Sequence, residues 1–135
     1  MYICDGALLK ITENDIVDGY FNCPDEVTEI GEYVFRGFEV KYLNLPNVTH
    51  IFDFAFFKCP VMSVYAPKLT YIGKFSFYDC PLLTFDFSKV THIGERAFKN
   101  CRFKKINIDI CNIRHIGLLA FENCPIKEIN IPSNF

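Results

Sequence analysis

Four of the seven cysteines recur at a nearly fixed interval, at Cys59, Cys80, Cys101 and Cys124. Thiols can ligate zinc or form disulfides, so their placement decides whether the chain carries metal or redox chemistry. If each interval is one rung of a stack, the thiols form a row with about 4.8 Å between rungs, and a row cannot close around one tetrahedral ion. Neighbouring side chains would also point the same way, which hinders the disulfide torsion. We therefore expect buried, reduced thiols and no cofactor, which favours a reducing compartment.

The three histidines, His50, His92 and His115, also occupy equivalent positions. We expect their rings to face outward in one column, with His92 and His115 on adjacent rungs about 5 Å apart. Two imidazoles this close could bind a metal ion or respond to pH at about 6. Exposed, unrelated side chains are the simpler interpretation, because Glu29 is the only carboxylate in the column and lies far along it. We favour that interpretation and predict no metal site.

Motifs of enzyme active sites are missing from the sequence. It contains no GxGxxG, GxxxxGK[ST], HExxH, GxSxG or CxxC pattern, and its acidic residues are scattered. We therefore predict that the chain is not an enzyme. Asn47-Val48-Thr49 matches a glycosylation sequon, but the match coincides with a step of the repeat described below and is explained by it.

The composition indicates one folded domain. Half of the 135 residues are hydrophobic and 16% are aromatic, which is enough for a continuous core. The net charge of −2 argues against binding to nucleic acid, and the sequence has no apolar run long enough for membrane insertion. Residues 1–10 lack the basic and apolar regions of a signal peptide, so we expect a cytoplasmic protein. A secreted or cell-surface location is the alternative if the N-terminus was trimmed.

The cysteines and histidines belong to a repeat that covers most of the chain. The pattern Ile-Gly-x-x-small-Phe returns with starts at Ile30, Ile51, Ile72, Ile93 and Ile116, and with its aromatic residue at Phe35, Phe56, Phe77, Phe98 and Phe121. Similarity at a fixed short period is typical of a solenoid, in which each coil is buried only by its neighbours. We expect the phenylalanines to form the central row of the core.

Each copy also contains a stretch in which polar and apolar residues alternate, as in a half-buried strand. Proline follows several of these stretches and ends the strand by withholding a backbone donor. We predict one parallel sheet of six strands, over residues 20–23, 42–45, 63–66, 84–87, 105–108 and 128–131.

A second apolar cluster, the Val-Thr-x-Ile step, lies before the glycine of each copy. The segment after the glycine, such as Glu95–Cys101, is too short for an independent helix, so we predict one helical or 3-10 turn with Phe and Cys inward. Phe52 replaces the glycine of the second copy, so that turn should differ, and Phe38 replaces the first cysteine. Two extra residues around 109–111 predict a loop, either a tolerated bulge or a contact point.

The ends of the chain depart from the period. We assign residues 1–19 to an N-terminal cap, with two short strands at 8–11 and 16–17 around a turn at 13–15, and residues 20–135 to the repeats of the same domain. The last residues, 132–135, follow a strand without a polar closing element. This leaves a free strand edge, on which a partner or a second copy of the chain could stack.

The repeat resembles the BspA-like leucine-rich repeat. The copy from Val90 to Ile108 carries its Val-Thr-x-Ile-Gly-x-x-Ala-Phe-x-x-Cys pattern, and Asp5-Gly6-Ala7-Leu8 looks like the stretch that precedes such repeats. The resemblance implies a leucine-rich repeat solenoid, mostly β and right-handed, with the strand sheet as binding face. It also implies an adhesion or interaction protein, and many members are secreted, unlike what the N-terminus here suggests.

The outward positions of the six predicted strands are rich in Tyr and Asn, a composition similar to that of antibody contact loops. We predict that they bind a protein partner, although a simply solvated sheet face would have the same alternation. These residues are Tyr20, Asn22, Tyr42, Asn44, Ser63, Tyr65, Thr84, Asp86, Lys105, Asn107, Glu128 and Asn130. The alternatives are an assembly subunit that stacks through its C-terminal coil, forming a homo-oligomer, and an adhesin-type fragment of a surface protein.

Overall fold

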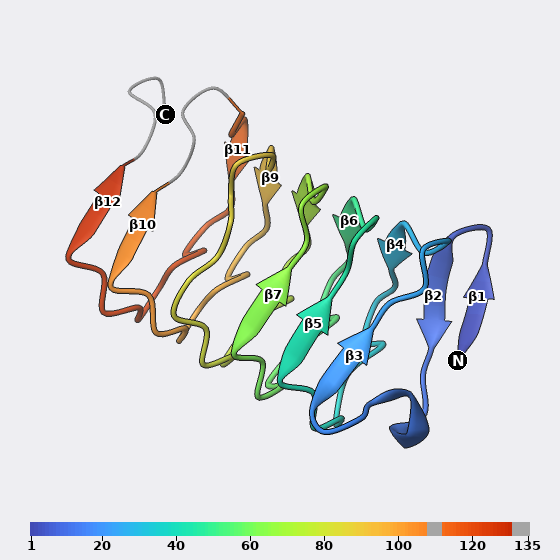
Figure 1. Ribbon diagram of the computed structural model, residues 1–135. Helices are drawn as coiled ribbons and strands as arrows, with labels where there is room; N and C mark the ends of the chain where they lie inside the picture. Colours follow the sequence, from blue (N-terminus) through green and yellow to red (C-terminus); the bar gives the residue numbers. More distant parts are fainter. Residues whose placement is uncertain (108–111, 131–135) are drawn as a thin grey trace.

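The computed structural model describes residues 1–107 and 112–130, which wind into a stack of similar coils with the N-terminus at one end (Figure 1). The predicted solenoid is confirmed, and the structure is mostly β with a parallel sheet. In the part of the chain that the structure describes, the one short helix is the 3-10 helix η1 (Glu13–Asp15). Within the described ranges, no helix has the length and apolar character needed to cross a membrane. The predicted loop at 109–111 and the chain end at 132–135 lie outside the described residues.

The longest sheet is built from the Val-Thr-x-Ile steps, not from the stretches predicted to be strands. In spatial order it contains β1 (Tyr2–Cys4), β2 (Ala7–Lys10), β4 (Glu29–Ile30), β6 (His50–Ile51), β8 (Tyr71–Ile72), β9 (His92–Ile93) and β11 (His115–Ile116). From β2 onward neighbouring strands are parallel. Threonine hydroxyls reinforce this sheet, because Thr70 Oγ1 donates to the carbonyl oxygen of Thr49 and Thr91 Oγ1 to that of Thr70.

The predicted six-stranded sheet is divided in two. β3 (Tyr20–Asn22), β5 (Tyr42–Asn44) and β7 (Ser63–Tyr65) form one parallel sheet, and β10 (Lys105–Asn107) pairs with β12 (Glu128–Asn130) in another. The strand predicted at 84–87 was wrong, since that segment forms no ladder. Phe85 and Phe87 stand where the neighbouring coils have smaller aliphatic side chains. Both rings pack against Phe98, and we attribute the break to the space they need.

The segments after each Ile are tight turns and not helical turns, which corrects the prediction. Two residues in each turn have a positive φ, for example Phe75 at 55° and Asp79 at 58°. Such left-handed residues interrupt a right-handed helix. The turns also bond to one another along the axis, as when the Phe56 N–H donates to the Ser76 carbonyl oxygen at 2.8 Å. The turn after Phe52 has the same form as the others, so the expected difference there was wrong.

The central phenylalanines stack in sequence order, as predicted. Ring centroids are 4.6 Å apart for Phe35 and Phe56, 5.2 Å for Phe56 and Phe77, and 5.4 Å for Phe77 and Phe98. These four rings are completely buried. Each coil therefore presents one ring to the coil on either side, which is the contact that makes neighbouring coils stabilise one another.

The N-terminal cap is a hairpin that starts earlier than expected. β1 and β2 pair antiparallel around a turn at Asp5 and Gly6, both with positive φ. Residues 13–15 form η1 and not the turn of a hairpin. The hairpin extends the long sheet at its N-terminal end, where β2 pairs with β4 and Leu8 is completely buried. The cap thus covers the first coil with a strand whose backbone continues the sheet.

Candidate partner-binding face

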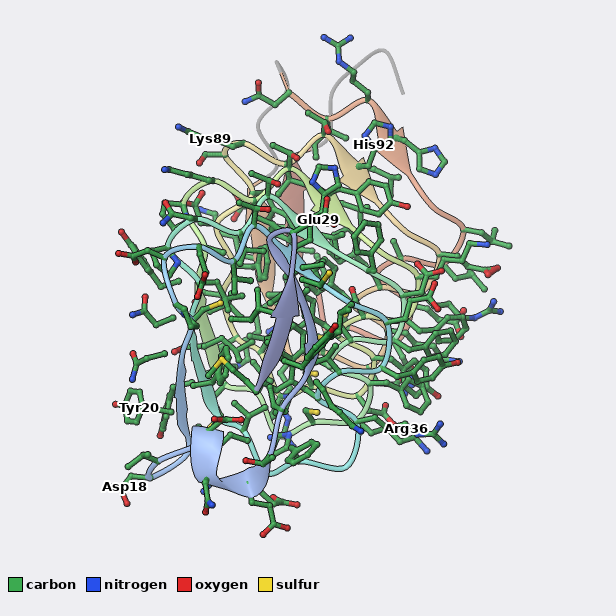
Figure 2. All side chains as sticks on the ribbon, turned by 90° about the vertical axis from the view of Figure 1, so that its right-hand side faces the viewer. Asp18, Tyr20, Glu29, Arg36, Lys89 and His92 are labelled. Carbon is green, nitrogen blue, oxygen red and sulfur yellow. The ribbon has the colours of Figure 1, made fainter. Side chains whose placement is uncertain are left out.

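The coil has three sides, and Figure 2 shows Tyr20, His92 and Arg36 on different ones. Tyr20 lies on β3, His92 on the long sheet and Arg36 in a turn. We call these sides the strand face, the long-sheet face and the turn face. The predicted contact residues belong to the strand face.

The first half of the strand face carries a cluster of three tyrosines. The strand register places Tyr20 beside Tyr42, and the two rings stack with 4.5 Å between their centroids and 30° between their planes. Tyr65 lies one strand further on, diagonal to Tyr42. Tyr20 is 50% and Tyr65 60% exposed. We call Tyr20, Tyr42 and Tyr65 the tyrosine cluster.

Hydrogen bonding between amides fixes the polar residues beside the cluster. Asn22 and Asn44 are paired in register, and Asn44 Nδ2 donates to Asn22 Oδ1 at 3.1 Å. Ser63 completes the row of Tyr20 and Tyr42 as an exposed, small residue. The structure therefore brings together six of the predicted residues on one preformed sheet.

The other predicted residues are separated from the cluster by the break in the sheet. Thr84 and Asp86 lie in the segment without a ladder. The Ser88 N–H donates to Asp86 Oδ1 at 2.9 Å, and this hydrogen bond holds the pKa of the Asp86 carboxyl below its usual value. The Asp86 carboxylate thus accepts a bond within its own turn, as expected of a turn former.

The C-terminal half of the strand face carries charges that offset each other. Lys105 and Glu128 are opposite each other on β10 and β12, and Lys105 Nζ lies 3.7 Å from Glu128 Oε1. Asn107 and Asn130 are register partners two positions further along these strands. Because both charged side chains are exposed, the pair adds little stability and leaves little net charge on this side.

The turn face contains an aromatic surface that the sequence analysis missed. Tyr33, Phe54 and Phe75 stack on successive coils with 4.9 Å between neighbouring centroids, and Phe57 stacks on Tyr78 at the same distance. Cations lie over these rings, for example Arg36 over Tyr33 at 5.5 Å. The signal was present, because an aromatic residue stands two positions before the central Phe in three copies. The rings stack face to face, which stabilises the contact between neighbouring coils and leaves mainly ring edges at the surface.

The histidines lie on the long-sheet face as predicted. Glu29, His50, Tyr71, His92 and His115 are successive partners in the strand register. The ring centroids of His92 and His115 are 6.0 Å apart. Within residues 1–107 and 112–130, no group of three or more His, Cys, Asp or Glu side chains is placed to hold a metal ion.

The cysteine row faces inward, as predicted. Each thiol donates to the carbonyl oxygen of the central Phe in the preceding coil, as when Cys80 Sγ contacts the Phe56 oxygen at 3.2 Å and Cys101 Sγ the Phe77 oxygen at 3.2 Å. Burial raises the pKa of Cys59 to about 12 and raises that of Cys80 strongly. A thiol that stays protonated is a poor nucleophile and metal ligand, so the row is structural.

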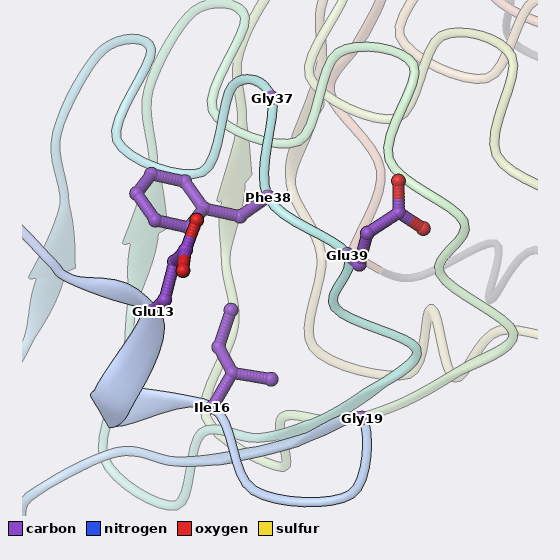
Figure 3. Close-up of a pocket in the computed structure, with 6 residues that line it drawn as sticks. All are labelled: Glu13, Ile16, Gly19, Gly37, Phe38 and Glu39. Carbon is purple, nitrogen blue, oxygen red and sulfur yellow. The ribbon is translucent and has the colours of Figure 1, made fainter.

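A pocket of about 310 Å³ lies between the N-terminal cap and the first turn (Figure 3). Ile16 and Phe38 form its apolar part, and Glu13 and Glu39 lie at its sides. Phe38 is the residue that replaces the first cysteine, and it packs against the core from this position. The pocket is open to solvent and lined by six residues from η1, the following turn and the first repeat.

Comparison with known proteins agrees with this architecture. The chain is similar to a leucine-rich repeat protein from Bacteroides ovatus ATCC 8483, whose crystal structure at 1.19 Å superposes with a TM-score of 0.73 at 25% sequence identity. The match covers 96% of this chain and 37% of that one, so this chain spans well under half of its relative's length. None of the curated proteins is significantly similar to the chain in sequence. The family described as BspA type Leucine rich repeat region matches residues 19–125 in six copies, and the chain belongs to that family.

Proposed function

We propose that the chain is a protein-interaction module that binds its partner through the tyrosine cluster. Leucine-rich repeats of this kind generally mediate protein interactions and are typically not enzymes, which supports the general class. The observation that carries the proposal is the exposure of Tyr20 and Tyr65 on a sheet whose backbone is already hydrogen-bonded. Tyrosine supplies rigid contact area at low entropic cost, and a preformed sheet loses little freedom on binding.

The chemistry around the cluster indicates the kind of partner surface that would fit. Asn22, Asn44 and Ser63 supply neutral hydrogen-bonding groups beside the rings. Met62 and Leu83, 48% and 57% exposed, add apolar area next to β7. The proposed partner is therefore a protein surface with apolar and neutral polar groups, not a polyanion.

Paired tyrosine substitutions test the proposal. Tyr42→Ala combined with Tyr65→Ala should abolish capture of the partner while the fold is retained, since Tyr65 is exposed and Tyr42 mainly loses its stack with Tyr20. Tyr2→Ala combined with Tyr33→Ala is the matched control, because it removes two exposed tyrosines from other sides of the coil. Partners identified by quantitative mass spectrometry should be retained by the control and lost from the first pair. Retention by both pairs would refute the assignment.

Assembly through the last coil is a second candidate, favoured by one observation. Leu118 is 67% and Leu119 40% exposed in the last described turn, whereas Glu95 and Arg96 at the equivalent positions of the preceding coil are half-buried. We propose that a second copy stacks there if the chain assembles. Light scattering would then give a defined oligomer that Leu118→Asp converts to monomer. A monomer at high micromolar concentration supports recognition by the tyrosine cluster alone.

We also propose, from the reduced cysteine row, that the domain works in a reducing compartment. Six cysteines in the described part of the chain are free thiols, and Cys59, Cys80 and Cys101 are buried with hydrogen-bonded Sγ atoms. Mass spectrometry of the protein from its native source should show these thiols unmodified. An adhesin-type role within a longer surface protein would instead place the domain outside the cell.

A further inference from the structure

We propose that His92 and His115 form a binding site for a divalent transition-metal ion on the long-sheet face. The two residues are direct register partners on β9 and β11, and both are exposed. Their rings line the same groove of about 460 Å³, together with Tyr71, Lys74 and Glu95. The proposed protein-binding role uses the strand face and not this surface.

The spacing of the two rings suits one shared ion. A metal about 2.0 Å from a ring nitrogen lies about 3.2 Å from that ring's centroid, so two rings on one ion have centroids at most about 6.4 Å apart. At a tetrahedral angle the separation would be about 5.2 Å. The observed separation is 6.0 Å, with 32° between the planes. The observed separation lies between these two values, so it allows both rings to coordinate one ion.

A hydrogen-bond chain sets the tautomer of His92. Thr91 Oγ1 donates its single proton to the carbonyl oxygen of Thr70 at 3.1 Å. It also lies 3.0 Å from His92 Nδ1, to which it has no second proton to give. With the Thr91 proton on that bond, His92 Nδ1 carries the hydrogen and donates it to Thr91 Oγ1, which leaves Nε2 with a free lone pair, and this is the tautomer that we propose. Metal-binding histidines usually have this arrangement, in which the other ring N–H is held by an oxygen.

The same arrangement of hydrogen bonds occurs at His50, but no second histidine lies beside His50 in the strand register. Thr49 Oγ1 donates to the Thr28 carbonyl oxygen and lies 2.9 Å from His50 Nδ1. The register neighbours of His50 are Glu29 and Tyr71. His50 is thus a matched control for a single histidine with the same local support.

The donor set selects the class of ion. Two imidazoles suit Zn²⁺, Ni²⁺ and Cu²⁺, with affinity highest for Cu²⁺, and do not suit Mg²⁺ or Ca²⁺. Lys74 and Glu95 carry opposite charges in the groove, so neither sign of field dominates, and the imidazoles supply the binding. Water completes the coordination, as expected for a site with two protein ligands.

Calorimetric titration with Zn²⁺ and with Mg²⁺ tests the site in the full chain. Cys4→Ser and Cys111→Ser in the parent protein remove an exposed thiol and the one thiol outside the described residues. We expect one Zn²⁺ per chain, no binding of Mg²⁺, and Zn²⁺ binding at least ten-fold weaker in His92→Gln and in His115→Gln. His50→Gln should leave the affinity unchanged.

The supporting hydroxyl has its own matched pair of variants. Thr91→Val should weaken Zn²⁺ binding about ten-fold, and Thr49→Val, which removes the same hydroxyl one step from His50, should not. Long-range proton–nitrogen spectra should show His92 with hydrogen on Nδ1 in the free protein and a shift of Nε2 on adding Zn²⁺. The proposal is overturned if the parent protein binds no Zn²⁺, or if His92→Gln and His115→Gln bind it as tightly as the parent.

Discussion

The rings of Phe77 and Phe98 lie parallel within 2°, with 5.4 Å between their centroids, and both are completely buried. Phe77 also contacts Phe56 on its other side and the edge of Phe85. A ring in this position stabilises two interfaces between coils at once, so the loss of one ring should be felt on both sides.

Phe77→Ala should lower the free energy of unfolding by about 3–5 kcal/mol, because it removes a buried ring and leaves a cavity. Phe77→Leu keeps most of the volume and should cost less. Urea unfolding measures both changes. Hydrogen exchange should accelerate in the coils that contain Phe56 and Phe98. A loss below about 1 kcal/mol for Phe77→Ala would contradict the role of the central row.

Stability should fall in alkali because of the cysteine row. Burial raises the pKa of Cys59 from its ordinary value of 9.0 to about 12. The unfolded chain therefore releases this proton at lower pH than the folded chain, so the stabilisation is complete below pH 9.0 and is lost as the pH rises toward about 12.

Unfolding free energies measured at intervals above pH 9.0 should decline, and Cys59→Ala should reduce the slope. Cys4, which is exposed, should react with a thiol reagent well before the buried thiols. If the unfolding free energy does not change with pH in this range, or if Cys59→Ala leaves the slope unchanged, then the buried thiols do not determine the pH dependence.

The left-handed turn positions provide a test of backbone strain. Gly37 has a φ of 82°, and a Cβ built on it would meet nothing within 4 Å. Gly37→Ala should nevertheless destabilise the protein by about 1–2 kcal/mol, because an L side chain disfavours this conformation. Lys58 holds the equivalent position with a φ of 59°, so Lys58→Gly should be more stable than Lys58→Ala. Thermal unfolding of the three variants measures these differences in stability. Equal stability of the two Lys58 variants would contradict backbone strain at this position.

Ser76 stands in the column of small residues before the central phenylalanines. Its Oγ is buried and lacks a hydrogen-bond partner among the described residues, whereas Ala55 and Ala97 hold the equivalent positions in the adjacent coils. Ser76→Ala should raise the free energy of unfolding by about 1 kcal/mol, since it removes an unsatisfied hydroxyl. Ala97→Ser is the reverse change and should lower it. The prediction fails if Ser76→Ala is destabilising.

The repeat period predicted the stacking because every inward column repeats at fixed spacing. The repeat aligns the phenylalanines from Phe35 to Phe121 and the cysteines from Cys59 to Cys124. In a solenoid, residues aligned in this way lie next to each other on successive coils. The hairpin was missed although Asp5-Gly6 is a two-residue turn signal. The same residues also match the stretch that precedes such repeats, and Glu13-Asn14-Asp15 offers a competing turn signal at 13–15.

Other features could not be predicted from the pattern. The left-handed positions hold Tyr33, Phe54 and Phe75. Because aromatic residues rarely adopt a positive φ, the residue types at these positions did not indicate left-handed turns. The break at 84–87 depends on the volume of Phe85 and Phe87 in a column where alternation alone looks regular. On the strand face, the alternation predicted which residues point outward. It did not predict the interruption of the sheet at residues 84–87, because of which only the tyrosine cluster and its neighbours form one continuous surface.

Site-specific photocrosslinking tests the proposed binding surface most directly. A photoreactive phenylalanine analogue is placed at position 65, in the tyrosine cluster, or at position 33, on the turn face, and irradiated in lysate from the native source. The two sites are comparably exposed, at 60% and 44%. We predict a discrete protein adduct from position 65 and none from position 33. Adducts from position 33 with none from position 65 would place recognition on the turn face and contradict the account.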